Sequence, residues 1–422
     1  MTAGGNHPSA DRSRPNNRRE TSSRQGSRHE SSGCAKPSDY DYSTKPRSGR
    51  WPAGRPATAP DFLLSRAHGS IRTQGSIATY TDPWLAAEHL RSGIHHMVVG
   101  AIPFNLDLPS ALTVPRDVIR SDQPLEPPAH YRWDAPPMNA TITSCDPEPE
   151  WHIERVSAAV RTIKASGLEK IVLARSLDLA IDPPVDPLQL ASRLIDGSPN
   201  RDGFIADLTP AGHRFQNRVL VGSSPEMLVR RRGTHVEAFP LAGSVPRERD
   251  KAADDAAKAR LADSRKNNEE HAYVVDDIAV NLEPLCKNLR VPEEPELLST
   301  SEMWHLGTHI YGELKDSSTS ALDLALTIHP TPAICGTPTE SAFSVINAVE
   351  TERGFYAGAV GWCDSNGDGE FVVSIRCAEM SMDGTNARLW AGGGIVETSV
   401  PEDELAETEA KLGTVLRAFG LR

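Results

Sequence analysis

The stretch between residues 170 and 239 contains the densest run of strand signals, and it restricts the fold more than any other part of the chain. LEKIVLARSLDLAI alternates along its length and is rich in β-branched residues, which predicts a strand over Lys170–Ile181. Shorter strands are predicted at Gly203–Leu208, Arg218–Gly222, Met227–Arg231 and His235–Phe239. So many short strands separated by glycine and proline indicate antiparallel sheets and disfavour a repeated βαβ fold.

Helices and hairpins are predicted on both sides of these strands. SNGDG and MDGTN each lie between two strand-like segments and predict hairpins. PLAGSVPR, with a proline near each end, is predicted to be a tight turn, and residues 104–150 an irregular connection. Helical spacing predicts helices at Glu154–Lys164, Asp250–Ser264, Asn267–Leu289 and Pro401–Phe419.

Residues 1–60 differ in composition from the rest of the chain, because Ser, Arg, Pro, Gly and Asn dominate and aliphatic side chains are almost absent. They include 11 Lys and Arg against 5 Asp and Glu. Such a segment cannot bury enough apolar surface to offset the entropy of ordering. We therefore predict a disordered basic tail at 1–60 and a single catalytic domain at 61–422. The tail is either an arm that contacts nucleic acid or a passive extension, and its scattered charges favour the second.

Charge and cysteine content argue against several classes of protein. The net charge of −12 disfavours a nucleic-acid binder, because phosphate contacts need a basic surface. The six cysteines form no CxxC pair and no metal-like spacing, which is typical of reduced cytosolic thiols. No apolar run reaches 18 residues, and no apolar segment of a secretory signal follows the N-terminal arginines. We therefore expect a cytoplasmic protein without nucleic-acid or membrane partners.

Two of the predicted helices carry carboxylates with both a structural and a chemical interpretation. Glu404 and Glu407 are three residues apart and Lys411 follows four residues later, so all three lie on one helix face. Glu270 lies near the start of the other helix, where the helix dipole favours acidic residues. These carboxylates are either parts of solvated helix surfaces or, with one contributed by each helix, ligands of Mg²⁺.

Four further sites each allow two interpretations. Lys170 begins an apolar strand and is either an exposed edge lysine or a buried base with a lowered pKa. Glu226 follows the bend GSSP and is either a turn residue or a general acid. Arg376, predicted to lie mid-strand in VVSIRCA, needs an internal carboxylate or a substrate carboxylate as its partner. Gly392–Gly394 forms either a bend or a cradle of N–H groups for a carboxylate.

Nine motifs occur in an order and spacing that resemble the chorismate-utilising enzymes. They are SSPEML, AFPLAGSVPR, RKNNEEH, MWHLGTHI, HPTPAICGTP, GFYAGAVGWCD, SIRCAEM, AGGGIV and ETEAKLG, and they extend the resemblance over roughly residues 61–422. That family includes isochorismate synthase, salicylate synthase and the large subunits of anthranilate and aminodeoxychorismate synthases. The resemblance implies an α+β fold in which two large antiparallel β-sheets pack face to face with helices outside.

The resemblance also implies roles for individual residues. Lys170 resembles the base that activates water for attack on C2 of chorismate, and Glu226 the acid that protonates the departing C4 hydroxyl. Mg²⁺, bound by Glu270 and Glu407 with Glu404 supporting it through water, would neutralise the ring carboxylate. The implied substrate-binding residues are Gly243, Ser244, His305, Ala333, Tyr356, Arg376, Gly392, Gly393, Gly394 and Lys411, of which Tyr356 and Arg376 would hold the enolpyruvyl carboxylate.

Two alanines indicate which member of the family the chain resembles. Ala242 stands where aminodeoxychorismate synthases carry a nucleophilic lysine, and Ala333 where members that eliminate pyruvate carry threonine. Both favour the Mg²⁺-dependent isomerisation of chorismate to isochorismate, for siderophore or menaquinone biosynthesis. The alternatives are a salicylate synthase, which would release pyruvate, and a non-catalytic homologue. Because water is the nucleophile, no glutamine amidotransferase subunit is expected, and we predict a monomer.

Overall fold

The computed structural model describes residues 51–52, 55–128, 131 and 138–421. Contacts divide the chain after residue 41, and the fold described below belongs to residues 42–422. Most of the predicted tail at 1–60 lies outside the described residues. Where it is described, Arg55 is buried, pairs with Asp186 and donates to the carbonyl oxygen of Pro60 (2.9 Å). The boundary of the catalytic domain stays a prediction.

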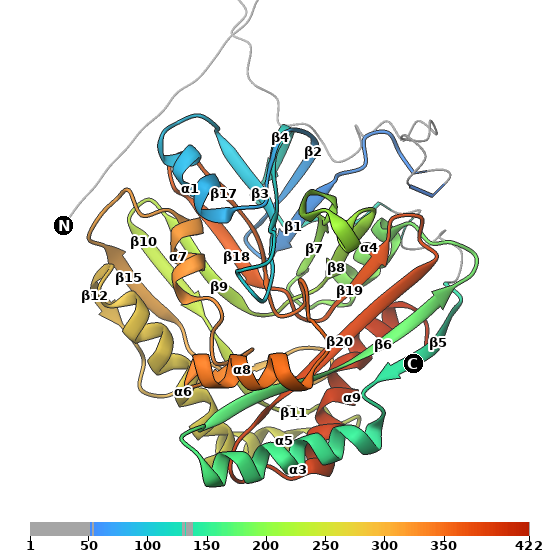
Figure 1. The fold of residues 1–422 in the computed structure, drawn as a ribbon, viewed down its shortest axis with the longest axis vertical. Helices are drawn as coiled ribbons and strands as arrows, with labels where there is room; N and C mark the ends of the chain where they lie inside the picture. Colours follow the sequence, from blue (N-terminus) through green and yellow to red (C-terminus); the bar gives the residue numbers. More distant parts are fainter. Residues whose placement is uncertain (1–50, 53–54, 129–130, 132–137, 422) are drawn as a thin grey trace, which may run out of the picture. The chain divides into compact units, whose positions relative to one another are not determined.

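Seventeen strands join into one hydrogen-bonded sheet in which neighbouring strands are antiparallel (Figure 1). From one edge the order is β5, β6, β20, β19, β8, β7, β1, β2, β4, β3, β17, β18, β9, β10, β15 and β12, and the short β16 pairs with the start of β6. In chain order the strands are Phe62–Arg66 (β1), Gly69–Tyr80 (β2), Met97–Ile102 (β3), Ala111–Ser121 (β4), Ala140–Asp146 (β5), Lys170–Ile181 (β6), Gly203–Asp207 (β7), Arg218–Gly222 (β8), Met227–Arg232 (β9), His235–Phe239 (β10), Cys286–Arg290 (β12), Ile310–Leu314 (β15), Gly336–Thr337 (β16), Ala359–Asp364 (β17), Gly369–Val373 (β18), Cys377–Ser381 (β19) and Asn386–Ile395 (β20).

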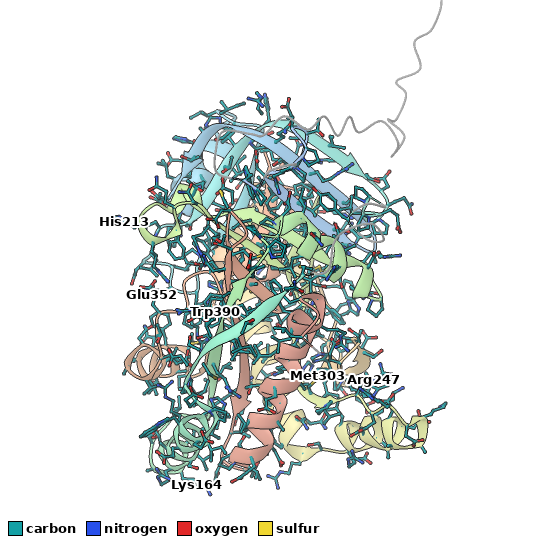
Figure 2. All side chains as sticks on the ribbon, turned by 90° about the vertical axis from the view of Figure 1, so that its right-hand side faces the viewer. Lys164, His213, Arg247, Met303, Glu352 and Trp390 are labelled. Carbon is teal, nitrogen blue, oxygen red and sulfur yellow. The ribbon has the colours of Figure 1, made fainter. Side chains whose placement is uncertain are left out.

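A second, smaller sheet has three strands: β11 (Leu241–Pro246), β14 (Met303–Gly307) and β13 (Glu296–Ser299), with β14 in the middle. The register of β11 shifts between Ala242 and Ser244, and Gly243 between them has φ +75°. This left-handed backbone favours glycine, so a bulge forms where the sequence offers one. After β11 the chain stays next to β14, and Figure 2 shows Arg247 close to Met303.

The predicted α+β class with antiparallel sheets is confirmed. The sheet has two halves, one that runs from β5 to β7 and one that runs from β2 to β12. Strand β1 joins them, because it pairs with β7 on one side and with β2 on the other. The halves share a core. Phe204 and Leu220 from one half and Val360 and Phe371 from the other belong to the same buried cluster.

Helix α4 covers the second face of β7 and β8, and α9 packs beside it against β20. Side chains alternate across β7, so that Phe204 faces the shared core while Ile205 joins Leu194 of α4 and Leu416 of α9 in a separate buried cluster. The helices span Pro83–Arg91 (α1), Pro149–Ala165 (α3), Pro187–Gly197 (α4), Lys251–Ala262 (α5), Arg265–Leu282 (α6), Ala321–Ile328 (α7), Thr339–Val349 (α8) and Pro401–Ala418 (α9), with 3₁₀ turns at Thr209–Ala211 and His213–Phe215.

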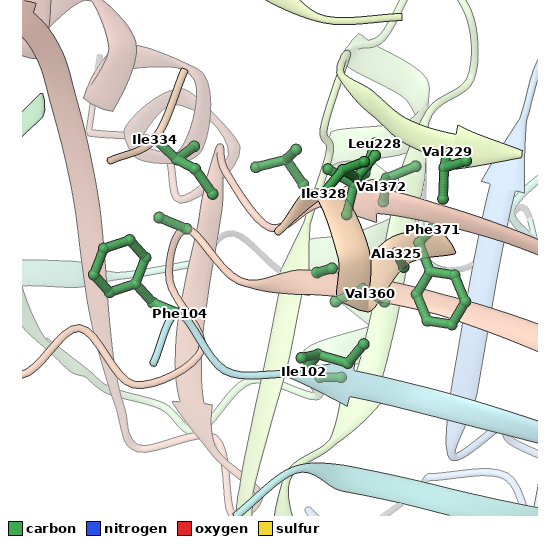
Figure 3. Close-up of a cluster of buried hydrophobic side chains, with 14 of the residues drawn as sticks. Ile102, Phe104, Leu228, Val229, Ala325, Ile328, Ile334, Val360, Phe371 and Val372 are labelled. Atoms are coloured by element: carbon green, nitrogen blue, oxygen red, sulfur yellow. The ribbon is translucent and has the colours of Figure 1, made fainter. Parts of the chain in front are cut away.

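The shared core extends under the segment that follows α7. Figure 3 shows Ile328 of this helix beside Leu228 of β9 and Ala325 beside Val360 of β17. Phe104 and Ile334 lie farther to the left in the same view, and all six side chains are in the same buried cluster. Helix α7 starts at a capping box in which Ser320 and Asp323 exchange hydrogen bonds. A well-anchored α7 therefore fixes the chain immediately before Ala333.

Four predictions about local structure were wrong. The predicted helix Asn267–Leu289 ends at Leu282, because Pro284 cannot continue it, and residues 286–290 form β12. PLAGSVPR is not a tight turn but strand β11, because β14 supplies its hydrogen-bonding partner. Residues 104–150 contain β4 and β5. Arg376 does not lie mid-strand: it lies between β18 and β19 with φ +50°.

Among the described residues, no helix combines the length and the apolar character needed to cross a membrane. The five cysteines in the described ranges are free, as predicted, and four of them are buried. The sixth, Cys34, lies outside those ranges.

Candidate active site

A cavity of about 60 Å³ lies between β6, β20, β11 and the segment after α7. It adjoins a chamber of about 310 Å³, and Pro225, Leu241, His305 and Arg376 line both spaces. Twelve of the fifteen predicted site residues line the cavity: Glu226, Gly243, Ser244, Glu270, His305, Ala333, Tyr356, Arg376, Gly392, Gly394, Glu407 and Lys411. The other three, Lys170, Gly393 and Glu404, are not part of this lining.

Lys170 lies behind the cavity wall at the start of β6, and its side chain is completely buried. Strand β16 covers one edge of β6 here, since Thr337 pairs with Lys170, and β20 covers the other. Nζ lies 3.2 Å from Oε1 of Glu270 on α6. Burial lowers the pKa of Lys170, while the charge of Glu270 opposes this effect. A buried lysine whose pKa is lowered towards the neutral amine is a candidate base.

Glu226 occupies the bend between β8 and β9 and is 3% exposed. Its backbone N–H donates to Oγ of Ser224 (3.2 Å), and its carbonyl oxygen accepts from the N–H of Val373 (3.1 Å). Burial raises the pKa of the Glu226 carboxyl to about 7, although the N–H of Leu241 and the charge of Lys170 lower it. At neutral pH this side chain can therefore hold a proton, as a general acid requires.

The three glycines of β20 leave space for side chains that reach the strand from both faces. A Cβ on Gly394 would lie 1.9 Å from Oε1 of Glu270, and one on Gly392 would lie 3.0 Å from the hydroxyl of Tyr356. A Cβ on Gly393 would lie 3.1 Å from Oε2 of Glu404, on the opposite face. All three pair regularly with β6 along one edge of β20, so they do not form the bend considered from the sequence. On the other edge, β19 pairs with residues 387–389, and the cradle for a carboxylate stays a prediction.

Glu404 and Glu407 on α9 each pair with a lysine. Glu404 pairs with Lys266 of α6, and Glu407 lies 2.5 Å from Lys411 and accepts a hydrogen bond from Oγ of Ser244 (2.9 Å). Burial and the charge of Glu407 raise the pKa of Glu404 to about 7. Although burial opposes it, Lys411 and Lys266 lower the pKa of Glu407 to about 2. Of these two carboxylates on one helix, Glu404 therefore takes up a proton at a higher pH than Glu407.

These acids are not gathered into a preformed metal centre. No group of three or more His, Cys, Asp or Glu side chains within the described ranges is arranged to hold a metal ion. One feature does suit a cation: Oε2 of Glu404 is buried without a hydrogen-bond partner among those residues. The oxygen donors expected from the sequence are thus present, on α6 and α9, but lysines balance their charge.

Arg376 presents its guanidinium at the junction of the cavity and the chamber and is 7% exposed. None of the described residues accepts a hydrogen bond from this guanidinium, although the Arg376 carbonyl oxygen accepts from the N–H of Ser223 (3.1 Å). Tyr356 stacks on Trp390 of β20 with 5.7 Å between ring centroids, and Figure 2 labels Trp390. Burial raises the pKa of the Tyr356 hydroxyl, so it stays protonated. The Arg376 guanidinium and the Tyr356 hydroxyl can therefore both donate hydrogen bonds to an anion.

His305 of β14 also lines both the cavity and the chamber. Burial and the positive charges of Arg376 and Lys411 hold its pKa well below the usual value, so the imidazole is neutral near pH 7. Its Nε2 is buried without a partner among the described residues. Nζ of Lys411 donates to the carbonyl oxygen of Gly392 (2.9 Å) and so joins α9 to β20.

Three residues around the site were not predicted from the sequence. Lys266 precedes Glu270 by four residues on α6, and this helical spacing was a usable signal. Trp390 stacks on Tyr356 from β20, and only the pairing of distant strands reveals it. Arg353 is buried and donates to the carbonyl oxygens of Ile334 (2.7 Å) and Val172 (2.8 Å), which ties the segment after α7 to β6.

Comparisons with known proteins agree on one family. Residues 120–420 match the family model described as "Chorismate binding enzyme". Isochorismate synthase DhbC of Bacillus subtilis is 44% identical over 333 residues, which cover 77% of this chain and 81% of that protein. Isochorismate synthase EntC of Escherichia coli K12 is 37% identical over 379 residues, covering 85% and 95%.

A solved structure supports the same relationship. The menaquinone-specific isochorismate synthase MenF of Escherichia coli superposes with a TM-score of 0.72 at 26% identity and covers 86% of this chain and 89% of that one. The superposition covers most of the chain, so this enzyme shares the fold described above.

Proposed function

The chain belongs to the chorismate-binding enzymes, and on that premise we propose that it is an isomerase that converts chorismate to isochorismate. The observation that carries this proposal is the pair Lys170 and Glu226, both buried beside one cavity and both with pKa values shifted towards the uncharged form. A reaction that adds water at one carbon and releases water from another needs a base to take one proton and an acid to supply another at the same pH.

In this reaction each side chain has one task. Lys170 would accept a proton from water as it attacks C2, and Glu226 would donate a proton to the departing C4 hydroxyl. The two proton transfers compensate each other, so the enzyme returns to its starting charge once protons re-equilibrate through solvent. Arg376 and Tyr356 would bind the enolpyruvyl carboxylate, because the Arg376 guanidinium has no acceptor among the described residues.

We propose Mg²⁺ as the cation for the ring carboxylate, with Glu270 and Glu407 as ligands and Glu404 in support. The buried Oε2 of Glu404 supports this, because it has no hydrogen-bond partner among the described residues and is therefore available to a water of the ion. All donors are oxygens, and Mg²⁺ prefers a few carboxylates together with water and substrate oxygens. When bound, the ion would neutralise the substrate carboxylate and orient the ring.

Ala333 and Ala242 support the isomerase over other reactions of the family. Ala333 lines the cavity with a methyl group and so offers no hydroxyl at that point, and Ala242 provides no amine nucleophile in β11. We propose that the chain acts alone on its small-molecule substrate, in siderophore or menaquinone biosynthesis, of which the printed title of the related MenF structure names the second.

Purified protein incubated with chorismate and Mg²⁺, with products separated by chromatography, tests the proposal. Isochorismate as the main product supports it. Salicylate with pyruvate, or anthranilate when ammonia is supplied, would reject it. Lys170→Met and Glu226→Gln should each abolish conversion. A Glu269→Gln variant provides the control, because Glu269 forms an ion pair with the exposed Arg265 on the surface of α6 and does not line the cavity.

A further inference from the structure

The bend that carries Glu226 is held from behind by charged residues that the mechanism above does not use. Arg66 is the last residue of β1. Its Nη1 donates to the carbonyl oxygen of Ser224 (2.7 Å) and pairs with Oδ1 of Asp202 (2.9 Å), while its Nε lies 3.2 Å from Oε1 of Glu370. The three charged side chains are at most 12% exposed. One guanidinium therefore joins a backbone carbonyl to two buried carboxylates.

The same bend is bonded to both ends of the proposed substrate site. Oγ of Ser224 accepts from the N–H of Glu226 (3.2 Å), and the N–H of Ser223 donates to the carbonyl oxygen of Arg376 (3.1 Å). Oγ of Ser223 also donates to the carbonyl oxygen of Asp202 (2.7 Å). A shift of the bend would therefore move the acid and the carboxylate-binding arginine together.

We propose that Arg66 is a positioning residue for this reaction: it holds the carbonyl of Ser224 and thereby fixes Glu226 and Arg376 relative to each other. The inference rests on the proposed function. It assigns a role in turnover to β1, which contributes no residue to the lining of the cavity.

The fork geometry of arginine is what this role requires. Arg66 uses separate nitrogens towards Glu370 and towards the Asp202–Ser224 pair, and a lysine ammonium is a single point that cannot reproduce both directions. Lysine would nevertheless keep a positive charge beside the two carboxylates. Glu370 also has a second partner, Nε2 of His68 at 2.7 Å. The Arg66→Lys variant therefore removes the contacts that hold the bend but keeps the positive charge beside Asp202 and Glu370.

Arg218 offers a matched control at the other end of β8. Its Nε donates to Oε1 of Glu379 (2.9 Å) and its Nη2 to the carbonyl oxygen of Glu379 (3.1 Å), so it also joins a carboxylate and a carbonyl. It has no contact with residues 223–226. Arg218→Lys therefore loses the same kind of two-nitrogen contact, but at a place that does not touch the bend at residues 223–226.

The test compares steady-state kinetics of the two variants with chorismate. We expect Arg66→Lys to lower kcat/KM by about 10- to 100-fold, because displacement of reacting groups by about 1 Å costs up to that factor. The kcat should fall and the KM should rise together, since the acid and the arginine move as one. Arg218→Lys should change neither parameter by more than about twofold. An unchanged kcat/KM in Arg66→Lys would overturn the proposal.

Hydrogen exchange measured by mass spectrometry provides a readout without turnover. Peptides covering residues 222–228 should exchange faster in Arg66→Lys and not in Arg218→Lys, because the amides of Ser223 and Glu226 lose their fixed acceptors. A loss of activity with unchanged exchange in this peptide would also overturn the proposal. If the wild-type protein fails to convert chorismate, the proposed function fails, while the exchange comparison still decides whether Arg66 holds the bend.

A second variant covers the case in which Arg66→Lys does not fold. Asp202→Asn keeps the shape of the side chain and removes one charged partner of Arg66. We expect a smaller effect in the same direction, about threefold to tenfold in kcat/KM, with faster exchange of the same peptide. Wild-type kinetics and exchange in Asp202→Asn would count against the proposal.

Discussion

Replacing Gly394 by alanine should damage the site far more than the same change at a neighbouring glycine. A Cβ there would lie 1.9 Å from Oε1 of Glu270 and 3.1 Å from Cε of Lys170, whereas Cβ atoms essentially never come closer than 3.0 Å to another heavy atom. Gly394 does not have a left-handed φ, so the change adds a steric clash without backbone strain. The Glu270 carboxylate would have to move by about 1.1 Å to restore 3.0 Å.

That movement sets the expected magnitude. The 3.2 Å contact between Glu270 and Lys170 would be disturbed, and a displacement of about 1 Å at a reacting group costs up to about 100-fold in rate. Overpacking of a buried site costs about 1–3 kcal/mol in the free energy of unfolding. We therefore expect Gly394→Ala to lower kcat/KM for chorismate by about 100-fold while remaining folded.

Gly393→Ala is the matched control, because its Cβ would lie 3.1 Å from Oε2 of Glu404, the end of a side chain that can shift slightly. Its kcat/KM should stay within about tenfold of the wild type. The assay is chromatographic detection of isochorismate, with thermal unfolding to show that both variants fold. Equal activity in the two variants would refute the argument that position 394 must lack a side chain to make room for Glu270.

Other parts of the structure give equally direct expectations. Because Glu226 acts when protonated and its pKa is raised to about 7, kcat/KM should fall as pH rises through about 7, while Glu226→Gln should stay inactive across the same pH range. Ala333→Thr should introduce pyruvate release, which a coupled lactate dehydrogenase assay detects. Arg353→Ala leaves the Glu350 carboxylate without its charged partner and should lower the free energy of unfolding by about 3–5 kcal/mol in a denaturant titration. The more exposed ion pair of Arg388 should contribute no more than about 1 kcal/mol in the same measurement.

The alternation and composition of short sequence segments predicted most of the strands of the sheet, but they predicted fewer features of the site. Strand β6 has the predicted bounds because its alternation and β-branched residues agree with burial on both faces. Arg376 was misplaced because its apolar neighbours resemble a strand, while the left-handed φ at this residue depends on contacts with the bend after β8. Strand β11 was missed for a related reason, since a chain with two prolines extends only where β14 offers hydrogen bonds.

The site residues themselves came from motif resemblance, and their geometry depends on pairings that spacing along the chain does not encode. Glu270 was expected on a helix face, but its approach to β20 depends on Gly394, 124 positions away in sequence. Similarly, nothing local indicates that Lys266 of α6 pairs with Glu404 of α9. Arg66 belongs to the same category, because its partners come from three separate strands or loops.

In each of the three acid–lysine pairs of the site, the lysine takes the place that a metal ion would otherwise have as the counter-charge of the carboxylate. Lys170, Lys266 and Lys411 already compensate the carboxylates that would hold Mg²⁺, so folding does not have to wait for a metal. A chelator should then abolish turnover and leave the melting temperature unchanged. Loading a divalent cation together with a dianionic substrate adds no net charge to the cavity, so the two should bind with positive cooperativity, each weak without the other.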